Sequence, residues 1–538
     1  MKKVVIYVEQ NPWVLYLSTV VLLFPALLIN LGLFPSTSDE HIRGLVALEM
    51  EIRDQFIIPT MYGEYYLKKP PLFNWMLIAY HNLFFDGYTE FSMRSLTVIF
   101  TLVYGFSIFY ILRKHFGSKF GFVAALIFIT SGRMLFWDTQ LALIDITYSW
   151  IVFLNFMVIY HYFKKGKFWH LFLISYFLTA IGYMFKGLPS LVFEGTTLLV
   201  FFIYKRRFLK LISWEHLAGF MVLLLIVGGY YLAFFLNFPG TIEDVFATLF
   251  DESSRRTVLR FGWQRTVIHF FTFPFEQFYH FFPWSLLIIA CFRRDFFKIL
   301  RRNDFILYNA LIFIANILIY WSSPEVYPRY LLMMAPLIFN VFLYYYYKSR
   351  EENNFRYKVV DYFLIFAAIT GSLGSLIFPF LEQTDHIPLI WLKSIALFLS
   401  LGFLSYLIIK IPQHRILIFG LIMLMVRIGF NWTVLEARAE LAHDTQAKAG
   451  AIELAIMTKG EPLHIYDGTP VDDFSAFYIT RERKKLLTRV RENYDKDAWY
   501  IMHPRYMDST RFKEHYRYKM VWDRTTALLV KFRDQTEK

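Results

Sequence analysis

Long apolar segments, separated by short polar loops, dominate the chain from Trp13 to about Phe430. A helix needs about 20 apolar residues to cross the hydrocarbon layer of a membrane. Because no water reaches the backbone there, each crossing segment must satisfy its own hydrogen bonds, as a helix does. The pattern therefore predicts a polytopic α-helical membrane protein. The predicted spans are residues 13–34, 92–112, 119–137, 141–163, 168–184, 187–204, 215–237, 277–292, 304–321, 327–347, 360–381, 388–410 and 414–431.

Composition and charge support this prediction. The 538 residues are 57% hydrophobic and 20% aromatic, which is more apolar than ordinary soluble domains. The net charge of +13 lies in short clusters between apolar segments, where membrane topology explains it better than nucleic-acid binding does. Lys2 and Lys3 precede the first apolar stretch, but Glu9 interrupts it and no small-x-small cleavage site follows, so we expect an uncleaved first span. The single cysteine, Cys291, excludes an intrachain disulfide.

The orientation of the chain depends on the segment 71–87, which is short for a span and has polar interruptions. If this segment lies along the membrane interface, all strongly basic short loops fall on one side. These loops begin near residues 113, 164, 205, 293, 348 and 410. The opposite short loops, which contain no Lys or Arg, are 138–140, 322–326 and 382–387. The positive-inside rule then gives thirteen spans, an inner N-terminus and an outer C-terminus.

Polar sequence replaces the apolar spans after about Asn431. We therefore divide the chain into a membrane domain, 1–431, with large outer loops at 35–91 and 238–276, and a small outer α/β domain, 432–538. In the small domain we expect a helix over 435–457 and short strands at PLHIYDG, SAFYIT, KLLTRV, AWYIMH and ALLVKF. The chain has no Walker, GxGxxG, CxxC or HExxH sequence to support nucleotide hydrolysis or common zinc hydrolase chemistry.

A carboxylate pair, Asp39-Glu40, follows the first span at the predicted outer interface. Such a pair can accept a proton from an acceptor hydroxyl or bind a divalent cation. The simpler interpretation is a helix N-cap, because Ser38-Asp39 precedes a helical pattern over 40–54. The pair alone favours the cap. Arg43 lies one turn later, on the same helical face as Asp39.

Two groups of cations are candidates for phosphate binding. Lys68 and Lys69 precede Pro70-Pro71 at the membrane surface, where they either bind a phosphate headgroup or snorkel beside an interfacial helix. The loop 251–265 carries four arginines, which suit a phosphate or are ordinary solvated charge. They are Arg255, Arg256, Arg260 and Arg265.

Three ionisable residues lie in or beside predicted spans. Asp145 opens the fourth span, and Lys186 lies at the junction of the fifth and sixth. Such a group is a functional candidate if it faces a cavity and an ordinary interfacial residue if it does not. Glu194 lies within the sixth span, where a charge is costly unless it is paired or hydrated.

The order of these elements resembles the first outer loop and later motifs of the bacterial GT-C glycosyltransferases. The closest resemblance is to the aminoarabinose (lipid A) transferase and protein O-mannosyltransferase superfamily. It rests on Asp39-Glu40, Glu49-Met50, Lys69-Pro70-Pro71-Leu72 with Trp75, Ile144-Asp145, Lys186-Gly187, Glu252 to Arg256 before Pro283-Trp284, and Tyr327-Pro328-Arg329-Tyr330 with Pro336. It covers the membrane portion in order, and the outer C-terminal domain matches the aminoarabinose-transferase layout.

The resemblance implies an inverting enzyme that takes a sugar from a polyprenyl-phosphate carrier at the periplasmic face of the bacterial inner membrane. It implies that Asp39 is the catalytic carboxylate, Asp145 a second cavity acid, and Lys69 and Arg256 ligands of the donor phosphate. The assigned residues are Asp39, Glu40 and Asp145 for catalysis; Lys69, Arg256, Lys186 and Arg43 for the phosphate; and Tyr330 and Arg329 for substrate. The donor already carries an activated phosphate, so no ATP motif is required.

The chain departs from the aminoarabinose-transferase pattern at two candidate metal ligands. That pattern has Glu before the motif lysine and Glu-His in the later loop, where this chain has Lys68 and Glu252-Ser253. Arg43 also follows Asp39 by four residues, where the pattern has three. No cofactor is therefore predicted, and a divalent metal stays an alternative. The acceptor is left open between a lipid A-like lipid and another cell-envelope molecule.

A transporter or flippase of a lipid-linked intermediate is the main alternative function, with Glu194 and the cavity acids as its path. The chain shows no repeated halves, and its candidate polar residues collect on one predicted face, which favours the transferase. A purely structural membrane subunit would leave Asp39, Lys69 and Asp145 without a role.

Overall fold

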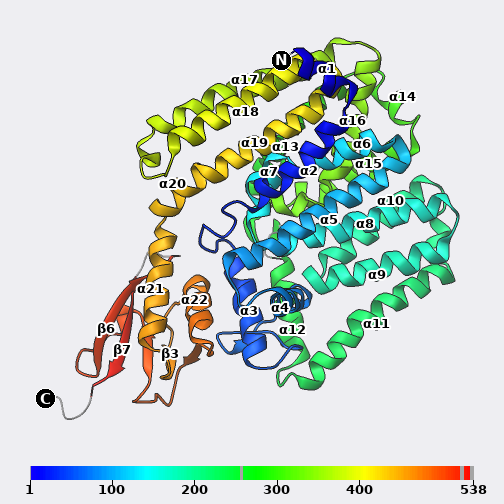
Figure 1. The fold of residues 1–538 in the computed structure, drawn as a ribbon. Coiled ribbons are helices and arrows are strands. Elements are labelled where there is room, and N and C mark those ends of the chain that lie inside the picture. Colours follow the sequence, from blue (N-terminus) through cyan, green and yellow to red (C-terminus); the bar gives the residue numbers. More distant parts are fainter. Residues whose placement is uncertain (1, 255–257, 522–525, 534–538) are drawn as a thin grey trace.

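A large helical body carries a small domain with a β-sheet at one end (Figure 1). The computed structural model describes residues 2–254, 258–521 and 526–533. The N-terminus lies at the end of the helical body away from the small domain. Helices α3 (Glu40–Ile52) and α4 (Leu72–Phe84) lie at the near end. This near end also holds Asp39 and Glu40, at the start of α3, and Lys68 and Lys69, just before α4.

Eight helices of the described chain are long and apolar enough to cross a membrane, and two bent helix pairs bring the number to ten. The eight are α5 (Glu90–Phe116), α8 (Ile144–Lys164), α9 (Phe168–Lys186), α11 (Trp214–Asn237), α15 (Asp304–Trp321), α17 (Phe355–Gly374), α18 (Ile390–Lys410) and α19 (Arg415–Trp432). The pairs are α1 (Lys2–Gln10) with α2 (Trp13–Leu28), bent by 93°, and α6 (Ser118–Ile129) with Gly132–Gln140, bent by 51°. The predicted multi-pass α-helical class is confirmed.

The other three predicted spans are helical over shorter stretches. They correspond to α10 (Pro189–Tyr204), to the end of α13 (Val258–His280) with the 3-10 helix η3 (Trp284–Cys291), and to η4 (Pro328–Leu331) with α16 (Ala335–Glu351). Proline accounts for two of the interruptions, because Pro283 precedes η3 and Pro328 opens η4. The connecting helices are α7 (Gly132–Phe136), η1 (Asp138–Gln140), η2 (Phe208–Ile212), α12 (Ile242–Ser254), α14 (Phe296–Leu300), η5 (Ser375–Phe380), η6 (Glu382–Thr384) and η7 (Pro412–His414).

The segment 71–87, which we expected to lie along the interface, forms helix α4. Its 13 residues span about 20 Å at 1.5 Å per residue, and a hydrocarbon layer is about 30 Å thick. The buried face of α4 includes Asn74, whose side-chain amide donates to the Arg43 carbonyl of α3 at 3.0 Å. The length of α4 agrees with the expectation that this segment does not cross.

The small domain combines helices with one five-stranded mixed sheet. Its helices are α20 (Val434–Leu441), α21 (His443–Met457), α22 (Asp473–Arg483) and the 3-10 turn η8 (Pro504–Tyr506). Its strands are β3 (Leu463–Tyr466), β4 (Thr488–Val490), β5 (Trp499–Met502), β6 (Phe512–Lys519) and β7 (Thr526–Phe532), in the order β4-β3-β5-β7-β6. The pairs of β3 with β4 and β5 are parallel, and β7 pairs antiparallel with β5 and β6. The predicted small α/β domain is confirmed.

One predicted strand of this domain is wrong. The stretch SAFYIT, Ser475–Thr480, lies in helix α22 and is buried throughout. The carboxylate of Asp472 accepts a hydrogen bond from the Ser475 amide at 2.7 Å and caps this helix. An apolar run that is buried on every side has no period, so its pattern does not separate helix from strand.

The expected strand list also omitted β6. This strand lies at the edge of the sheet and alternates charged with aromatic residues, and most of its side chains are partly or fully exposed. Edge strands carry such charges because they leave unpaired backbone groups open to other chains. Because of these charges, β6 lacks the apolar run that predicted the other strands.

The small domain is docked on the helical body mainly through α22. Gly44 of α3 lies against the Phe477 ring, and a Cβ at Gly44 would be 2.5 Å from that ring. At the start of α5, Glu90 accepts hydrogen bonds from Tyr478 at 2.7 Å and from Lys448 at 2.5 Å. The Tyr478 hydroxyl in turn accepts from the Ser36 amide at 2.9 Å, just ahead of Asp39.

Candidate active site

The loops and helix ends at the near end enclose a polar cavity of about 180 Å³. Its lining residues are Asp39, Ile42, Arg43, Tyr66, Lys68, Lys69, Leu143, Ile144, Asp145, Lys186, Glu252, Arg329 and Tyr330. The structure thus brings together seven of the nine residues that the sequence assigned to a site. The two others are Glu40, which does not line the cavity, and Arg256, which lies outside the described residues.

Arg329 connects the two acids of the cavity. Its guanidinium Nη2 lies 3.1 Å from Asp39 Oδ2, and its Nε lies 3.5 Å from Asp145 Oδ2. Nη1 donates to the Ser38 hydroxyl at 3.0 Å. The two carboxylates provide counter-charges for this buried guanidinium. The sequence placed Arg329 among the substrate ligands and did not foresee this bridge.

Asp145 and Lys186 form a second pair at the ends of two antiparallel helices. Lys186 Nζ lies 2.5 Å from Asp145 Oδ1, and both side chains are about nine-tenths buried. Asp145 lies in the first turn of α8 and Lys186 ends α9, so each charge also has the sign that its helix dipole favours. The Tyr330 ring lies 3.9 Å from Lys186 Nζ and completes this wall.

The N-cap interpretation of Asp39 is wrong for its side chain. Asp39 occupies the position before α3, but its carboxylate makes no capping hydrogen bond. The Thr37 amide donates instead to Glu40 Oε2 at 2.7 Å. The Asp39 carboxylate turns into the cavity toward Arg329, and 49% of its side chain remains exposed. One side of this acid is therefore accessible to a second molecule.

Glu40 has the opposite environment, and its predicted catalytic role has no geometric support. The residue is fully buried. Its carboxylate receives hydrogen bonds from Arg94 at 2.8 and 2.9 Å, from the Ala142 amide at 2.7 Å and from the Thr37 amide. A carboxylate with four donors is a cross-link. It fixes the Thr37–Glu40 segment to the start of α5 and to the loop ahead of α8.

Arg43 and Tyr66 form a buried pair on the cavity wall. Arg43 Nη2 donates to the Tyr66 hydroxyl at 3.0 Å, while Arg43 Nη1 is buried with no hydrogen-bond partner among the described residues. Burial raises the pKa of the Tyr66 phenol, and Arg43 opposes this effect. Tyr66 was not predicted as a site residue. An unsatisfied buried guanidinium nitrogen is costly unless a ligand completes its bonding.

A mostly apolar cavity of about 290 Å³ adjoins the polar one. The two share Lys68, Lys69, Lys186, Glu252 and Tyr330, and Lys69 Nζ lies 3.7 Å from Glu252 Oε1. The apolar part is lined by residues of α10 and α15, namely Leu188, Pro189, Val192, Phe193, Ile319 and Tyr320. A polar chamber with basic walls thus continues into a groove suited to a hydrocarbon chain.

The charges of the polar cavity favour an anion over a metal ion. Its lining holds five cationic and three acidic side chains. The guanidinium of Arg329 lies where a cation shared by Asp39 and Asp145 would bind. Among the described residues no group of three or more His, Cys, Asp or Glu side chains has the arrangement of a metal site. The donor set therefore does not fit a divalent cation.

The loop that carries Lys68 and Lys69 is anchored by a short hairpin of β1 (Thr60–Met61) and β2 (Glu64–Tyr65). Its turn residues, Tyr62 and Gly63, both have positive φ. The Glu49 carboxylate accepts from their amides at 2.7 and 3.1 Å. The Tyr62 hydroxyl donates to Asp473 of α22. The small domain therefore contacts the segments that precede both Asp39 and the lysines.

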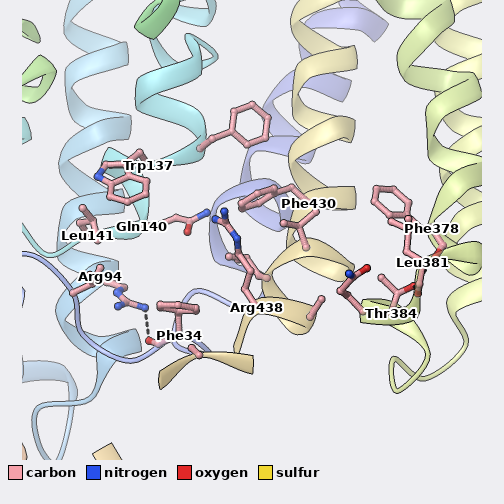
Figure 2. A pocket seen from close by; sticks show the side chains of 17 residues that line it. Phe34, Arg94, Trp137, Gln140, Leu141, Phe378, Leu381, Thr384, Phe430 and Arg438 are labelled. Atoms are coloured by element: carbon pink, nitrogen blue, oxygen red, sulfur yellow. Dashed lines mark hydrogen bonds between the residues drawn. The ribbon is translucent and has the colours of Figure 1, made fainter. Parts of the chain in front are cut away.

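A larger, separate cavity of about 550 Å³ lies next to the Asp39 segment. Thr37 and Leu141 line it, whereas Asp39 and Leu143, two residues further along the same segments, line the polar site. Figure 2 shows aromatic and aliphatic side chains around this space, with Arg438 extending into it. None of its 17 lining residues carries a carboxylate.

Comparisons with known proteins agree with this architecture. The family model described as dolichyl-phosphate-mannose-protein mannosyltransferase matches residues 68–231. Crystal structures of ArnT from Cupriavidus metallidurans are similar over 97% of this chain and 98% of theirs. The complex with undecaprenyl phosphate is 15% identical with a TM-score of 0.67, and the apo state is 16% identical with a TM-score of 0.68. The predicted resemblance to GT-C transferases is confirmed at the level of the fold.

One curated relative, an uncharacterized protein of Aquifex aeolicus (strain VF5), is 21% identical over 233 residues. That match covers 43% of this chain and 44% of the relative, so the two are similar over less than half of their lengths.

Proposed function

We propose that this protein is an inverting glycosyltransferase that uses a polyprenyl-phosphate sugar at the periplasmic face of a bacterial inner membrane. The observation that carries the proposal is the alternating row Asp39–Arg329–Asp145–Lys186, in a cavity with further cations and an apolar extension. The row supplies an acid and its orienting partner, and the remaining cations suit a phosphate. The matching mannosyltransferase family model and the ArnT fold support a polyprenyl-linked donor.

The donor phosphate fits the side of the cavity formed by Arg43 and Lys69. Arg43 and Lys69 both line this cavity, so a phosphate bound there would meet two cationic side chains. The polyprenyl chain would extend into the adjoining apolar groove. Negative charge grows on the leaving phosphate as its bond to the sugar breaks, and fixed cations stabilise that charge. The phosphate-binding role of Arg256 stays a prediction from the sequence.

Asp39 is the proposed general base. An acceptor hydroxyl attacks the anomeric carbon, its proton passes to Asp39, and the bond from that carbon to the phosphate oxygen breaks. The products are the glycosylated acceptor and the polyprenyl phosphate. Arg329 holds Asp39 Oδ2 at 3.1 Å, and the exposed half of the acid faces the incoming hydroxyl. Asp145 pairs with both Arg329 and Lys186 and orients them, so we assign it a positioning role.

The acceptor is a lipid or another cell-envelope molecule, and the cavity beside Thr37 supports the lipid. It is mostly apolar, it is separate from the donor cavity, and it reaches within two residues of Asp39. Displacement with inversion requires the nucleophile and the leaving phosphate on opposite faces of the sugar. An acceptor cavity that is separate from the donor cavity is compatible with this requirement.

The proposal is tested with purified protein and undecaprenyl-phosphate-linked mannose or aminoarabinose. Binding of the lipid and release of undecaprenyl phosphate are measured for wild type, Lys69→Ala and Arg43→Ala. We expect both variants to lose about 10²-fold or more in kcat/KM, because each removes a donor to the leaving phosphate. Lys165→Ala, in the loop between α8 and α9, is the matched control and should behave as wild type.

Two outcomes would contradict this function. Equal binding and turnover in wild type and both variants would exclude Arg43 and Lys69 as the phosphate site. Movement of the intact lipid across vesicles, without cleavage of its sugar–phosphate bond, would establish the flippase instead.

A further inference from the structure

A cavity of about 1,000 Å³ opens at the end of the helical body opposite the candidate active site. Its walls include Phe116, at the C-terminal end of α5, whereas the N-terminal end of α5 contacts the active-site segment through Arg94. The 27 residues of α5 separate these two ends by about 40 Å. This cavity therefore belongs to a different surface from the proposed transfer site.

The rim of this cavity is basic. Lys119, Lys348, Arg350 and His414 line it together with Glu9 and Glu351. Both carboxylates have local partners: Glu9 accepts from Gln413 Nε2 at 2.7 Å, and Glu351 lies 3.0 Å from Lys348 Nζ. Lys119 is exposed and makes no ion pair with any residue that the structure describes.

Arg350 is the second cation without a carboxylate partner in the described chain. Its one polar contact is a 3.4 Å bond to the Gln413 carbonyl. Lys119 and Arg350 come from α6 and α16, so they reach the cavity from two different helices. A negatively charged ligand between them would meet a point charge and a planar fork of donors.

The deeper walls of the cavity are apolar and aromatic. They include Phe116, Phe120, Val123, Ile416 and Leu417, and the tyrosines Tyr16, Tyr344 and Tyr347 also line the cavity. Tyrosines concentrate at the boundary between headgroups and hydrocarbon, because they have an apolar ring and a polar tip. The cavity thus combines cationic and apolar walls, which suit the phosphate headgroup and the acyl chains of a phospholipid.

The orientation of helix α1 indicates that this cavity lies at the level of the lipid headgroups. It meets α2 at 93°, and the bend includes Pro12, which lines the cavity. Val4, Ile6 and Tyr7 are exposed apolar residues of α1, and Lys2 and Lys3 begin it. A short helix of this kind, perpendicular to a spanning helix, lies in the headgroup plane.

We propose that this cavity binds an anionic glycerophospholipid of the leaflet opposite the transfer site. Lys119 and Arg350 hold the headgroup phosphate, and the apolar walls accept the glycerol and the first part of the acyl chains. The leaflet with basic loops attracts anionic lipid, so the required ligand is concentrated at this surface. The proposal does not depend on the transferase function.

The test uses native mass spectrometry of the full-length protein with phosphatidylglycerol and phosphatidylethanolamine of identical chains. Wild type should retain phosphatidylglycerol preferentially, by about tenfold or more, because each Lys or Arg near an anionic lipid strengthens the binding of that lipid. Lys119→Glu with Arg350→Ala should abolish this preference, and Lys119→Arg should keep it. Lys164→Ala with Lys165→Ala is the control, because these residues belong to the same end but do not line the cavity.

Three results would overturn the proposal. One is a Lys119→Glu, Arg350→Ala protein that keeps the preference. Another is displacement of the lipid by millimolar inorganic phosphate, which would indicate a simple anion site. The third is competition by undecaprenyl phosphate, which would place the bound lipid in the donor groove. Equal unfolding temperatures in detergent for wild type and all variants show that the variants are folded.

Discussion

Asp39 and Glu40 are adjacent carboxylates with different environments. Asp39 is half exposed and faces Arg329, whereas Glu40 is fully buried and receives four hydrogen bonds. A general base needs access to its proton donor, and only Asp39 has it. Replacing the carboxylate by an amide should therefore lower turnover at Asp39 and lower stability at Glu40.

Asp39→Asn should lower turnover of an undecaprenyl-phosphate sugar by about 10²–10⁴-fold, the usual contribution of a general base. Binding of undecaprenyl phosphate should be unchanged, because the cations around it remain. Asp86→Asn, an exposed acid of the loop before α5, serves as the control. Turnover equal to wild type in Asp39→Asn would exclude this acid as the base.

Glu40→Gln should lower the stability of the protein. The amide keeps the size of the side chain but leaves the buried Arg94 charge without a counterion, which costs roughly 3 kcal/mol or more. Thermal unfolding in detergent, followed by tryptophan fluorescence, measures this change, with Asp39→Asn as the stable comparison. An unchanged unfolding temperature together with lost turnover would instead support a catalytic role for Glu40.

At the scale of elements, α3 joins the site to the small domain. Its first residues position Asp39 and Glu40, and its next face packs on α22, where Gly44 allows Phe477 to approach. His41 lies in the same interface, with its ring centroid 6.0 Å from that of Phe474. Neither ring nitrogen of His41 has a hydrogen-bond partner among the described residues. Burial without a partner disfavours the charged form of this imidazole.

The docking of the small domain should weaken at acidic pH. Burial lowers the pKa of His41 in the folded protein, whereas the unfolded chain binds a proton near pH 6.5. The carboxylates that oppose this effect are Asp473, Glu40, Asp39 and Asp472. Because the unfolded state binds more protons, stability rises with pH through this window and is lost as the pH falls below about 6.5.

Unfolding temperatures measured between pH 8 and pH 5 should show this loss in wild type. His41→Phe, which keeps the ring without the titratable group, should have a flatter profile than wild type in the same range. Equal slopes for the two proteins would assign the acid sensitivity to other groups.

At the scale of the whole molecule, α3 and the small domain share one end of the helical body (Figure 1). The candidate site lies at this end, and the basic cavity lies at the other. The positive-inside rule predicts that the end with the basic loops faces the cytoplasm. It requires that the α8–α9 loop, which contains Lys165, and the small domain face opposite sides of the membrane.

Single cysteines test this orientation in a Cys291→Ser background. Asn493→Cys, exposed in the small domain, should react with a membrane-impermeant maleimide in intact spheroplasts. Lys165→Cys should react only after permeabilisation. Labelling of Lys165→Cys but not of Asn493→Cys in intact cells would reverse the orientation.

The sequence by itself determined the membrane class, the helical segments, the small α/β domain and the residue types of the site. These properties are local: a span requires length and apolarity, and a motif requires a few adjacent residues. The order of the motifs was enough to predict the GT-C fold. The sequence also singled out Lys69, Asp145 and Lys186 as candidates, without their mutual contacts.

Only the tertiary structure decided how these residues meet. Arg329 and Asp39 are 290 positions apart, and their contact turns Asp39 away from the cap that its local sequence favours. Arg94, 54 positions from Glu40, removes that acid from the cavity. Ser475–Thr480 is buried between α3 and α21, and this stretch, whose sequence resembled a strand, is a helix. Each outcome depends on a partner distant in sequence, because burial and ion pairing are properties of the assembled chain and not of a segment.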